Sequence, residues 1–196
     1  HAAMPHQNID VITAASTLVN SIQTLISRVL DPMQGAVISI TKFQSRGSES
    51  LNVMPEYVEL GGSVRTFGEE NRTMIEKRLK EMTEQIASAY HCEAEFKFTR
   101  GYPSVVNSGA ETDIAHQAAA ATVGADNASN KFVPTMGGED FAYFLQHSPG
   151  AYIALGQKDE HKTAQLRSPH YDFNDDVIPI GASYWINLVK ATLPLS

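Results

Sequence analysis

GAVISITKF at residues 35–43 and YVELGGSVRT at residues 57–66 are the two stretches that decide the fold. The first is rich in β-branched residues, which favour strands. In the second, Val58, Leu60 and Val64 alternate with polar residues, which is the pattern of a strand with one buried face. The turn-rich segment SRGSES at residues 45–50 lies between them. The two stretches therefore predict a β-hairpin.

Amphipathic helices are expected on both sides of this hairpin, because residues 9–30 and 69–90 repeat apolar side chains at helical spacing. Residues 92–99 then alternate apolar and polar positions, as a further strand does. The order α-β-β-α-β lacks only the first strand of the ferredoxin-like unit β-α-β-β-α-β. We expect that strand to lie before His1, which makes the chain the tail of a longer protein.

The turn-rich stretch GYPSVVNSG at residues 101–109 marks a boundary, and the composition changes after it. Beyond it we expect an Ala-rich helix at 110–123, a short helix near Glu139, a buried strand at 150–156 and a last helix at 176–192. This half holds few strands of its own, so it is expected to complete a sheet begun elsewhere. The sequence thus predicts a ferredoxin-like domain at 1–104 that lacks its first strand, followed by a second part at 105–196.

Charge and composition exclude several classes of protein. Fifteen Lys and Arg against 22 Asp and Glu give a net charge of −7 and a pI near 5.4. Nucleic acids and anionic membranes require a basic surface, so neither is expected as a partner. No uninterrupted apolar run approaches the roughly 20 residues of a membrane-spanning helix. The single cysteine, Cys92, forms no internal disulfide, and the composition favours a cytoplasmic protein.

Two short segments contain residues suited to chemistry, and each has a simpler interpretation. HAAMPH at residues 1–6 places His1 before a helix, where an imidazole can polarise a carbonyl or ligate a metal; exposed loop histidines are the alternative. GGEDF at residues 137–141 joins two glycines to two acids. Gly137 and Gly138 would allow a substrate to approach the backbone, or they simply permit a turn before acids that favour a helix N-terminus.

Three further residues are candidates. His170, among the carboxylates of residues 167–176, is either a metal ligand or part of a helix-capping loop. Arg65 lies on the polar face of its strand, where it either binds a carboxylate through two hydrogen bonds or is solvated. Asn52 stands at the entrance to the same strand.

Together these stretches resemble the carboxyl-terminal half of the M20 family of metallopeptidases and amidohydrolases. The closest likeness is to hippurate, N-acyl-amino-acid and auxin-conjugate hydrolases. The likeness is carried, in family order, by HAAMPH at 1–6, NVMPEYVELGGSVRTF at 52–67, MGGEDFAYF at 136–144 and SPHYDFNDDVIPIGASYW at 168–185.

The resemblance implies a catalytic α/β domain with two divalent ions, zinc, manganese or similar, and an inserted ferredoxin-like lid that forms a homodimer. It assigns residues 1–104 to that lid and residue 105 onward to the end of the catalytic domain. His1 corresponds to a lid histidine that stabilises the oxyanion, often from the partner subunit. Asn52, Arg65, Gly137 and Gly138 correspond to substrate-binding residues, with Arg65 on the substrate carboxylate.

The sequence departs from the family pattern at the last metal ligand. The family has a His there, whereas this chain has Arg167, and His170 follows three residues later. The family's catalytic base and most other ligands correspond to positions before His1. We therefore expect the 196 residues alone to hold no metal and to be inactive.

The favoured interpretation is part of a metal-dependent amidohydrolase that cleaves the amide bond of N-acyl amino acids or small peptides. The alternative is a non-catalytic dimerisation or substrate-binding module derived from the same family, which Arg167 favours. Residues 9–30 and 35–43 are the expected dimer surface.

Overall fold

The structure, a computed structural model, describes residues 1–193 and divides into two compact units. The first comprises His1–Ser104 together with Thr135–Gly138, and the second comprises Val105–Pro134 together with the chain from Glu139 onward. Residues 194–196, which end the second predicted domain, lie outside the described residues.

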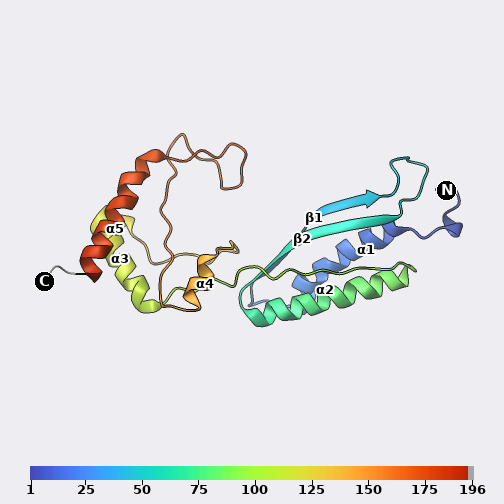
Figure 1. The fold of residues 1–196 in the computed structure, drawn as a ribbon, viewed down its shortest axis with the longest axis horizontal. Coiled ribbons are helices and arrows are strands. Elements are labelled where there is room, and N and C mark those ends of the chain that lie inside the picture. Colours follow the sequence, from blue (N-terminus) through green and yellow to red (C-terminus); the bar gives the residue numbers. More distant parts are fainter. Residues whose placement is uncertain (194–196) are drawn as a thin grey trace. The chain divides into compact units, whose positions relative to one another are not determined.

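The first unit is built on the predicted hairpin, which is confirmed (Figure 1). Strand β1 (Ala36–Arg46) pairs antiparallel with β2 (Tyr57–Thr66), and Val37 lies opposite Arg65. Gly47 turns the chain after β1 with a φ of 99°, a left-handed conformation that glycine adopts without steric cost.

Two helices accompany this hairpin, as the apolar periodicity predicted. α1 (Val11–Thr24) continues into the π-helical turn η2 (Leu25–Val29), and α2 spans Glu69–Ala89. Asp10 caps α1, because its Oδ1 accepts a hydrogen bond from the Thr13 amide at 3.0 Å. The same hydrogen bond lowers the pKa of Asp10.

The core of the first unit lies where α1, α2 and the hairpin meet. Ile75 of α2 is completely buried, and Leu25 is 2% exposed. The buried cluster comprises Ile22, Leu25, Ile38, Ile75 and Leu79. Burial of these apolar side chains is what holds the helices on the sheet.

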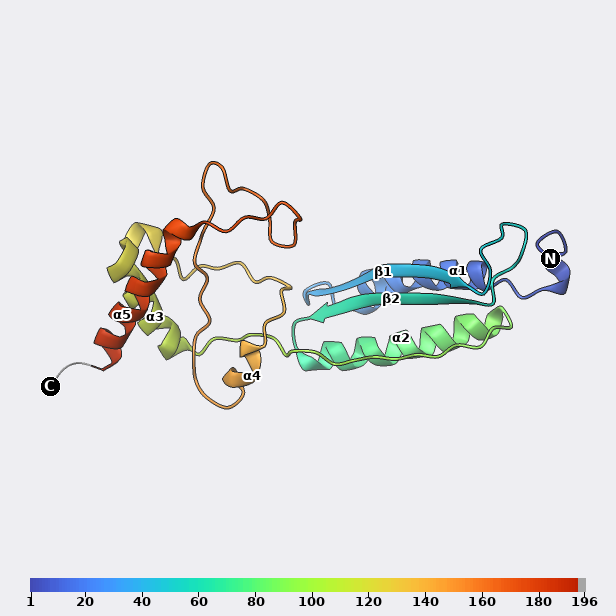
Figure 2. The same cartoon turned by 45° about the horizontal axis from the view of Figure 1, so that its top comes forward.

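Residues 92–100 are extended but belong to no sheet, so the strand predicted at 92–99 has no ladder in the described part of the chain. Figures 1 and 2 show the segment running back beside α2. Of the apolar positions in this alternation, Phe96 and Phe98 are half-buried against the core, whereas Ala94 is exposed. A strand ladder needs hydrogen bonds to a neighbouring strand, and this segment pairs with neither β1 nor β2.

The second unit contains α3 (Gly109–Val123), α4 (Phe141–Leu145) and α5 (Ile178–Thr192). α3 and α5 lie side by side in both views (Figures 1 and 2), and Asn187 Nδ2 donates to Thr122 Oγ1 at 2.9 Å between them. The predicted helices at 110–123 and 176–192 are thereby confirmed.

The prediction of a buried strand at 150–156 is wrong. These residues form no strand, and Tyr152 and Leu155 are 46% and 45% exposed. An apolar run becomes a strand only beside a hydrogen-bonding partner, and within residues 1–193 the second unit contains no strand. No helix among the described residues is both long and apolar enough to cross a membrane.

The core assignment leads to a stability prediction. Ile75→Ala removes a fully buried side chain and leaves a cavity, so we expect the free energy of unfolding to fall by about 2–5 kcal/mol. Met33→Ala is the control, because Met33 is 91% exposed and should change stability by about 0.5 kcal/mol or less. Urea unfolding measures both, and equal losses would contradict the assigned core.

Candidate functional site

The first candidate, His1, lies in a loop closed by its own hydrogen bonds. Asn8 Nδ2 donates to the carbonyl oxygens of His1 and Met4, at 3.1 and 2.7 Å. His1 Nδ1 accepts the Ala3 amide at 3.1 Å. An accepting Nδ1 in a neutral imidazole leaves the proton on Nε2. The exposed ring therefore presents an N–H donor, which is the group that an oxyanion needs.

Asn52 is joined directly to this loop. The Ala2 amide donates to the Asn52 carbonyl oxygen at 3.0 Å, so the chain before α1 is attached to the loop between β1 and β2. The Asn52 side chain is exposed. Two of the predicted site residues, His1 and Asn52, are thus brought together at the end of the hairpin where β2 begins.

Arg65 and Gly138 form a second pair. A Cβ atom placed on Gly138 would lie 2.6 Å from Arg65 Nη1, so only glycine leaves the guanidinium its present position. Arg65 is exposed, and no carboxylate lies within ion-pair distance of it among residues 1–193. A guanidinium in this situation can take an external carboxylate.

The two pairs lie at opposite ends of β2. From Tyr57 to Arg65 the strand advances about 26 Å, at roughly 3.3 Å for each residue. Asn52 comes before that strand begins. A single N-acyl amino acid is much shorter than this distance, so one molecule of it cannot contact both pairs within the same chain.

Gly137 and the acidic residues after it are placed differently. A Cβ on Gly137 would meet only Thr135 Oγ1, at 3.5 Å, so this position is not crowded. Within the second unit, Glu139 Oε2 accepts a hydrogen bond from the Tyr152 hydroxyl at 3.0 Å. Hydrogen bonds from the Asp140 carboxyl and from Tyr152 lower the pKa of Glu139, and the shared hydrogen bond raises the pKa of Asp140.

The candidate metal ligand, His170, lies in an exposed loop, where its backbone amide donates to Ser168 Oγ at 3.1 Å. Nearby, Asp172 is paired with Lys162, at 2.5 Å between Oδ2 and Nζ. Arg167 has a φ of 72°, an uncommon conformation for a residue with a side chain.

No three His, Cys, Asp or Glu side chains among residues 1–193 converge in the way that a metal site requires. Catalytic zinc sites take about three protein ligands. The donors that the structure describes therefore do not fit a metal site by themselves, and His170 stays a prediction.

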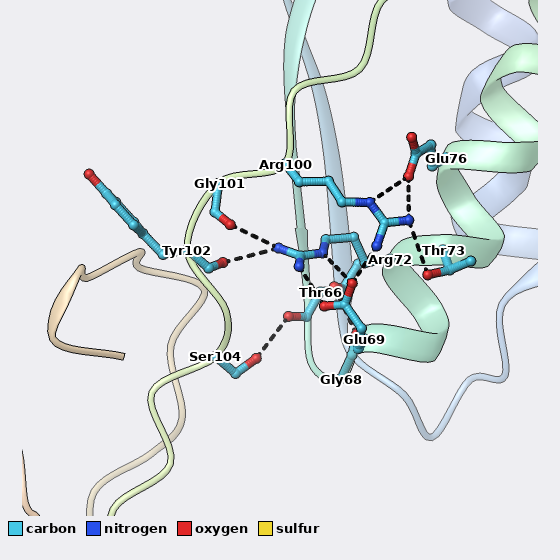
Figure 3. A network of polar contacts seen from close by, with 10 residues as sticks. All are labelled: Thr66, Gly68, Glu69, Arg72, Thr73, Glu76, Arg100, Gly101, Tyr102 and Ser104. Carbon is cyan, nitrogen blue, oxygen red and sulfur yellow. Dashed lines mark hydrogen bonds and ion pairs between the residues drawn. The ribbon is translucent and has the colours of Figure 1, made fainter. Parts of the chain in front are cut away.

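An ion-pair network holds the chain just beyond residue 99 against the start of α2 (Figure 3). Arg100 contacts Glu69 at 2.6 Å and Glu76 at 2.5 Å. Arg72, only 19% exposed, pairs with Glu69 and donates from Nη1 to the carbonyl oxygens of Gly101 and Tyr102, at 3.0 and 3.3 Å.

Sequence reasoning missed this network. The spacing of Glu69 and Arg72 on a helix could have indicated their pairing, because residues three apart share a face. Nothing in the sequence pattern shows that Arg100 returns to the same place from the far end of α2.

Comparison with known proteins gives consistent results. The profile of peptidase family M20/M25/M40 matches residues 5–191. An N-acetyl-L-cysteine deacetylase of Bacillus subtilis is 36% identical over 190 residues, which are 95% of this chain and 42% of that protein. The IAA-amino acid hydrolase ILR1-like 2 of Arabidopsis thaliana is 34% identical over 188 residues, 93% of this chain and 42% of that one.

A solved structure is similar as well. The YXEP protein of Bacillus subtilis, described as a dinuclear metal binding peptidase from the M20 family, matches with a TM-score of 0.69 and 30% identity. The match covers 92% of this chain and 45% of that protein. The chain spans less than half the length of these relatives.

The hydrogen bond between Tyr152 and Glu139 can be tested by titration. Tyr152→Phe removes the donor, so we expect the pKa of Glu139 to rise toward its usual value of 4.5. A lowered pKa stabilises the fold above the unfolded pKa, and that contribution is lost as the pH falls through the folded pKa. The variant should therefore lose less stability than the parent on acidification.

NMR titration of the carboxyl carbons measures this pKa. Tyr57→Phe is the control, since Tyr57 lies in the first unit and should leave Glu139 unchanged. An unchanged Glu139 pKa in Tyr152→Phe would contradict the interaction.

Proposed function

The chain belongs to peptidase family M20/M25/M40, and from this premise we propose that it is the lid and the end of the catalytic domain of a metal-dependent amidohydrolase. We assign residues 1–104 to a ferredoxin-like lid and residue 105 onward to the catalytic domain. The proposed substrates are N-acyl amino acids or small peptides, cleaved at the amide bond. The deacetylase and the IAA-amino acid hydrolase among the relatives support this substrate class.

The observation that carries the proposal is the separation of the two residue pairs along β2. Arg65 beside Gly138 offers a cation that has no carboxylate partner among residues 1–193, and His1 beside Asn52 offers an N–H donor. The pairs are complementary to the two ends of an N-acyl amino acid, yet about 26 Å of strand keeps them apart. We therefore assign them to two different catalytic centres of a homodimer.

In this arrangement each centre uses Arg65 and Gly138 of its own chain and His1 and Asn52 of its partner. Arg65 orients the substrate by its carboxylate. His1 donates from Nε2 to the carbonyl oxygen as negative charge develops there, and Asn52 offers a neutral amide beside it. The metal ions and the base that activates water would come from parts of the protein that correspond to positions before His1.

The dimer surface is proposed to be α1 and β1. The outer edge of β1 pairs with no strand among the described residues, and Val37 and Phe43 on this strand are 39% and 45% exposed. An uncovered strand edge with apolar side chains tends to pair with another chain. A cytoplasmic location remains part of the same proposal.

A non-catalytic module of the same family is the second candidate, and Arg167 favours it. A guanidinium offers no lone pair to a metal and stays protonated at ordinary pH. Metal analysis of the intact protein separates the two candidates. If the wild-type protein binds divalent metal and Arg167→His binds more, the chain belongs to an enzyme whose metal site Arg167 impairs. If neither protein binds metal, the non-catalytic module is supported.

The roles of Arg65 and His1 predict opposite kinetic effects in the intact enzyme. Arg65→Ala should mainly raise KM for an N-acetyl amino acid, because it removes a carboxylate contact present in the ground state. His1→Ala should mainly lower kcat, by about 100-fold, because an oxyanion contact matters most in the transition state.

Steady-state kinetics on N-acetyl-L-amino acids measures both effects, with Arg78→Ala as a surface control on α2. Arg78 is 54% exposed and pairs only with Glu81 among the described residues. Exchange of the two kinetic effects would mean that the roles of Arg65 and His1 are reversed. Full activity in both variants would reject the proposed function.

A further inference from the structure

We propose that Tyr102 determines which amino-acid side chains the Arg65 site accepts, and that Arg72 positions Tyr102 for this task. The inference rests on the proposed function, because it takes Arg65 as the ligand of the substrate carboxylate. It adds a specificity residue and a positioning residue to that site.

Three residues converge on one small space. A Cβ placed on Gly138 would lie 2.6 Å from Arg65 Nη1 and 3.4 Å from Tyr102 Cδ2. The guanidinium and the aromatic ring therefore border the same bare stretch of backbone. The Tyr102 side chain is 48% exposed, so part of it faces the surroundings.

The chemistry of the substrate follows from these neighbours. A carboxylate bound to Arg65 has the α-carbon as its next atom, and the amino-acid side chain branches from that carbon. A side chain that branches there lies beside the Tyr102 ring. Aromatic rings favour apolar and aromatic partners, so this site should prefer N-acyl derivatives of large apolar amino acids to those of glycine.

Hydrogen bonds from Arg72 and Ser104 hold the backbone around Tyr102 (Figure 3). Arg72 Nη1 donates to the carbonyl oxygens of Gly101 and Tyr102, at 3.0 and 3.3 Å. Two residues further on, Ser104 Oγ donates to the Thr66 carbonyl oxygen at 3.3 Å, next to Arg65. The backbone of Tyr102 is thus fixed to α2 on one side and to the end of β2 on the other.

Arg72 is the residue on which this arrangement depends most. At 19% exposure it is the least exposed cation of the network, and Glu69 orients it at 2.5 Å. Its Nη1 donates to the two carbonyls while its Nε and Nη2 pair with Glu69, and a single ammonium group cannot spread its donors in this way. Arg100 contributes a parallel anchor through Glu69 and Glu76 but contacts neither carbonyl.

The test compares N-acetyl-L-phenylalanine with N-acetylglycine in the intact, metal-loaded enzyme. Tyr102→Ala should raise KM for the phenylalanine derivative about tenfold and change KM for the glycine derivative less than about twofold. Tyr102→Phe keeps the ring and should retain the preference. Arg72→Ala should shift the KM ratio in the same direction as Tyr102→Ala with little change in kcat.

Two further measurements separate positioning from a merely structural role. The double variant of Tyr102→Ala and Arg72→Ala should change the ratio no more than Tyr102→Ala alone, because both act through one ring. Arg78→Ala is the matched control and should leave the ratio unchanged, since Arg78 contacts Glu81 and not the 100–104 segment.

Equal effects of Tyr102→Ala on both substrates, or no effect, would overturn this inference and leave the proposed function standing. If Arg72→Ala lowers the stability of the enzyme and lowers kcat equally for both substrates, the role of Arg72 is only structural. That result would overturn its positioning role. If the wild-type enzyme cleaves neither substrate, the proposed function fails and the inference fails with it.

Discussion

The backbone pairing of β1 with β2 fixes the distance on which the functional account depends. Strand residues advance at a nearly constant rate, and the antiparallel ladder keeps both strands extended. The buried cluster around Ile75 holds α1 and α2 against this hairpin. The two helices therefore keep the paired strands extended. Consequently His1 with Asn52 stays at one end of β2, and Arg65 with Gly138 stays at the other.

This separation gives the proposed dimer a functional reason. A two-fold symmetric dimer repeats the same contacts in both directions. The His1 end of each chain can therefore lie beside the Arg65 end of the other chain. Each centre would then be incomplete without its partner. The network around Arg72 belongs to the Arg65 end, where it fixes the backbone of Tyr102 beside the proposed carboxylate site.

Local patterns in the sequence predicted the elements whose stability is local. The hairpin, α1 and α2 follow from alternation and helical spacing. The strand predicted at 92–99 has no ladder and the one at 150–156 is absent, because a strand needs a partner that periodicity does not reveal.

The candidate site was also predictable in part, in its residue types but not in their arrangement. The residue types were predictable one by one, and the resemblance named His1, Asn52, Arg65, Gly137 and Gly138 together. The grouping of His1 with Asn52 and of Arg65 with Gly138 was not predictable, because it depends on which end of a strand each residue lies near. The return of Arg100 to the start of α2 depends on the whole length of that helix, which a local pattern does not record.

The most direct test of the shared centres is subunit mixing. Intact enzyme carrying His1→Ala is unfolded together with enzyme carrying Arg65→Ala, and the equal mixture is refolded so that subunits exchange. In a mixed dimer one centre combines an intact Arg65 with an intact partner His1. At substrate concentrations well below KM, where both single variants are slow, activity should therefore recover to about a quarter of the wild-type value. Activity that stays at the average of the two separately refolded variants would contradict the account and place both residue pairs in a single chain's centre.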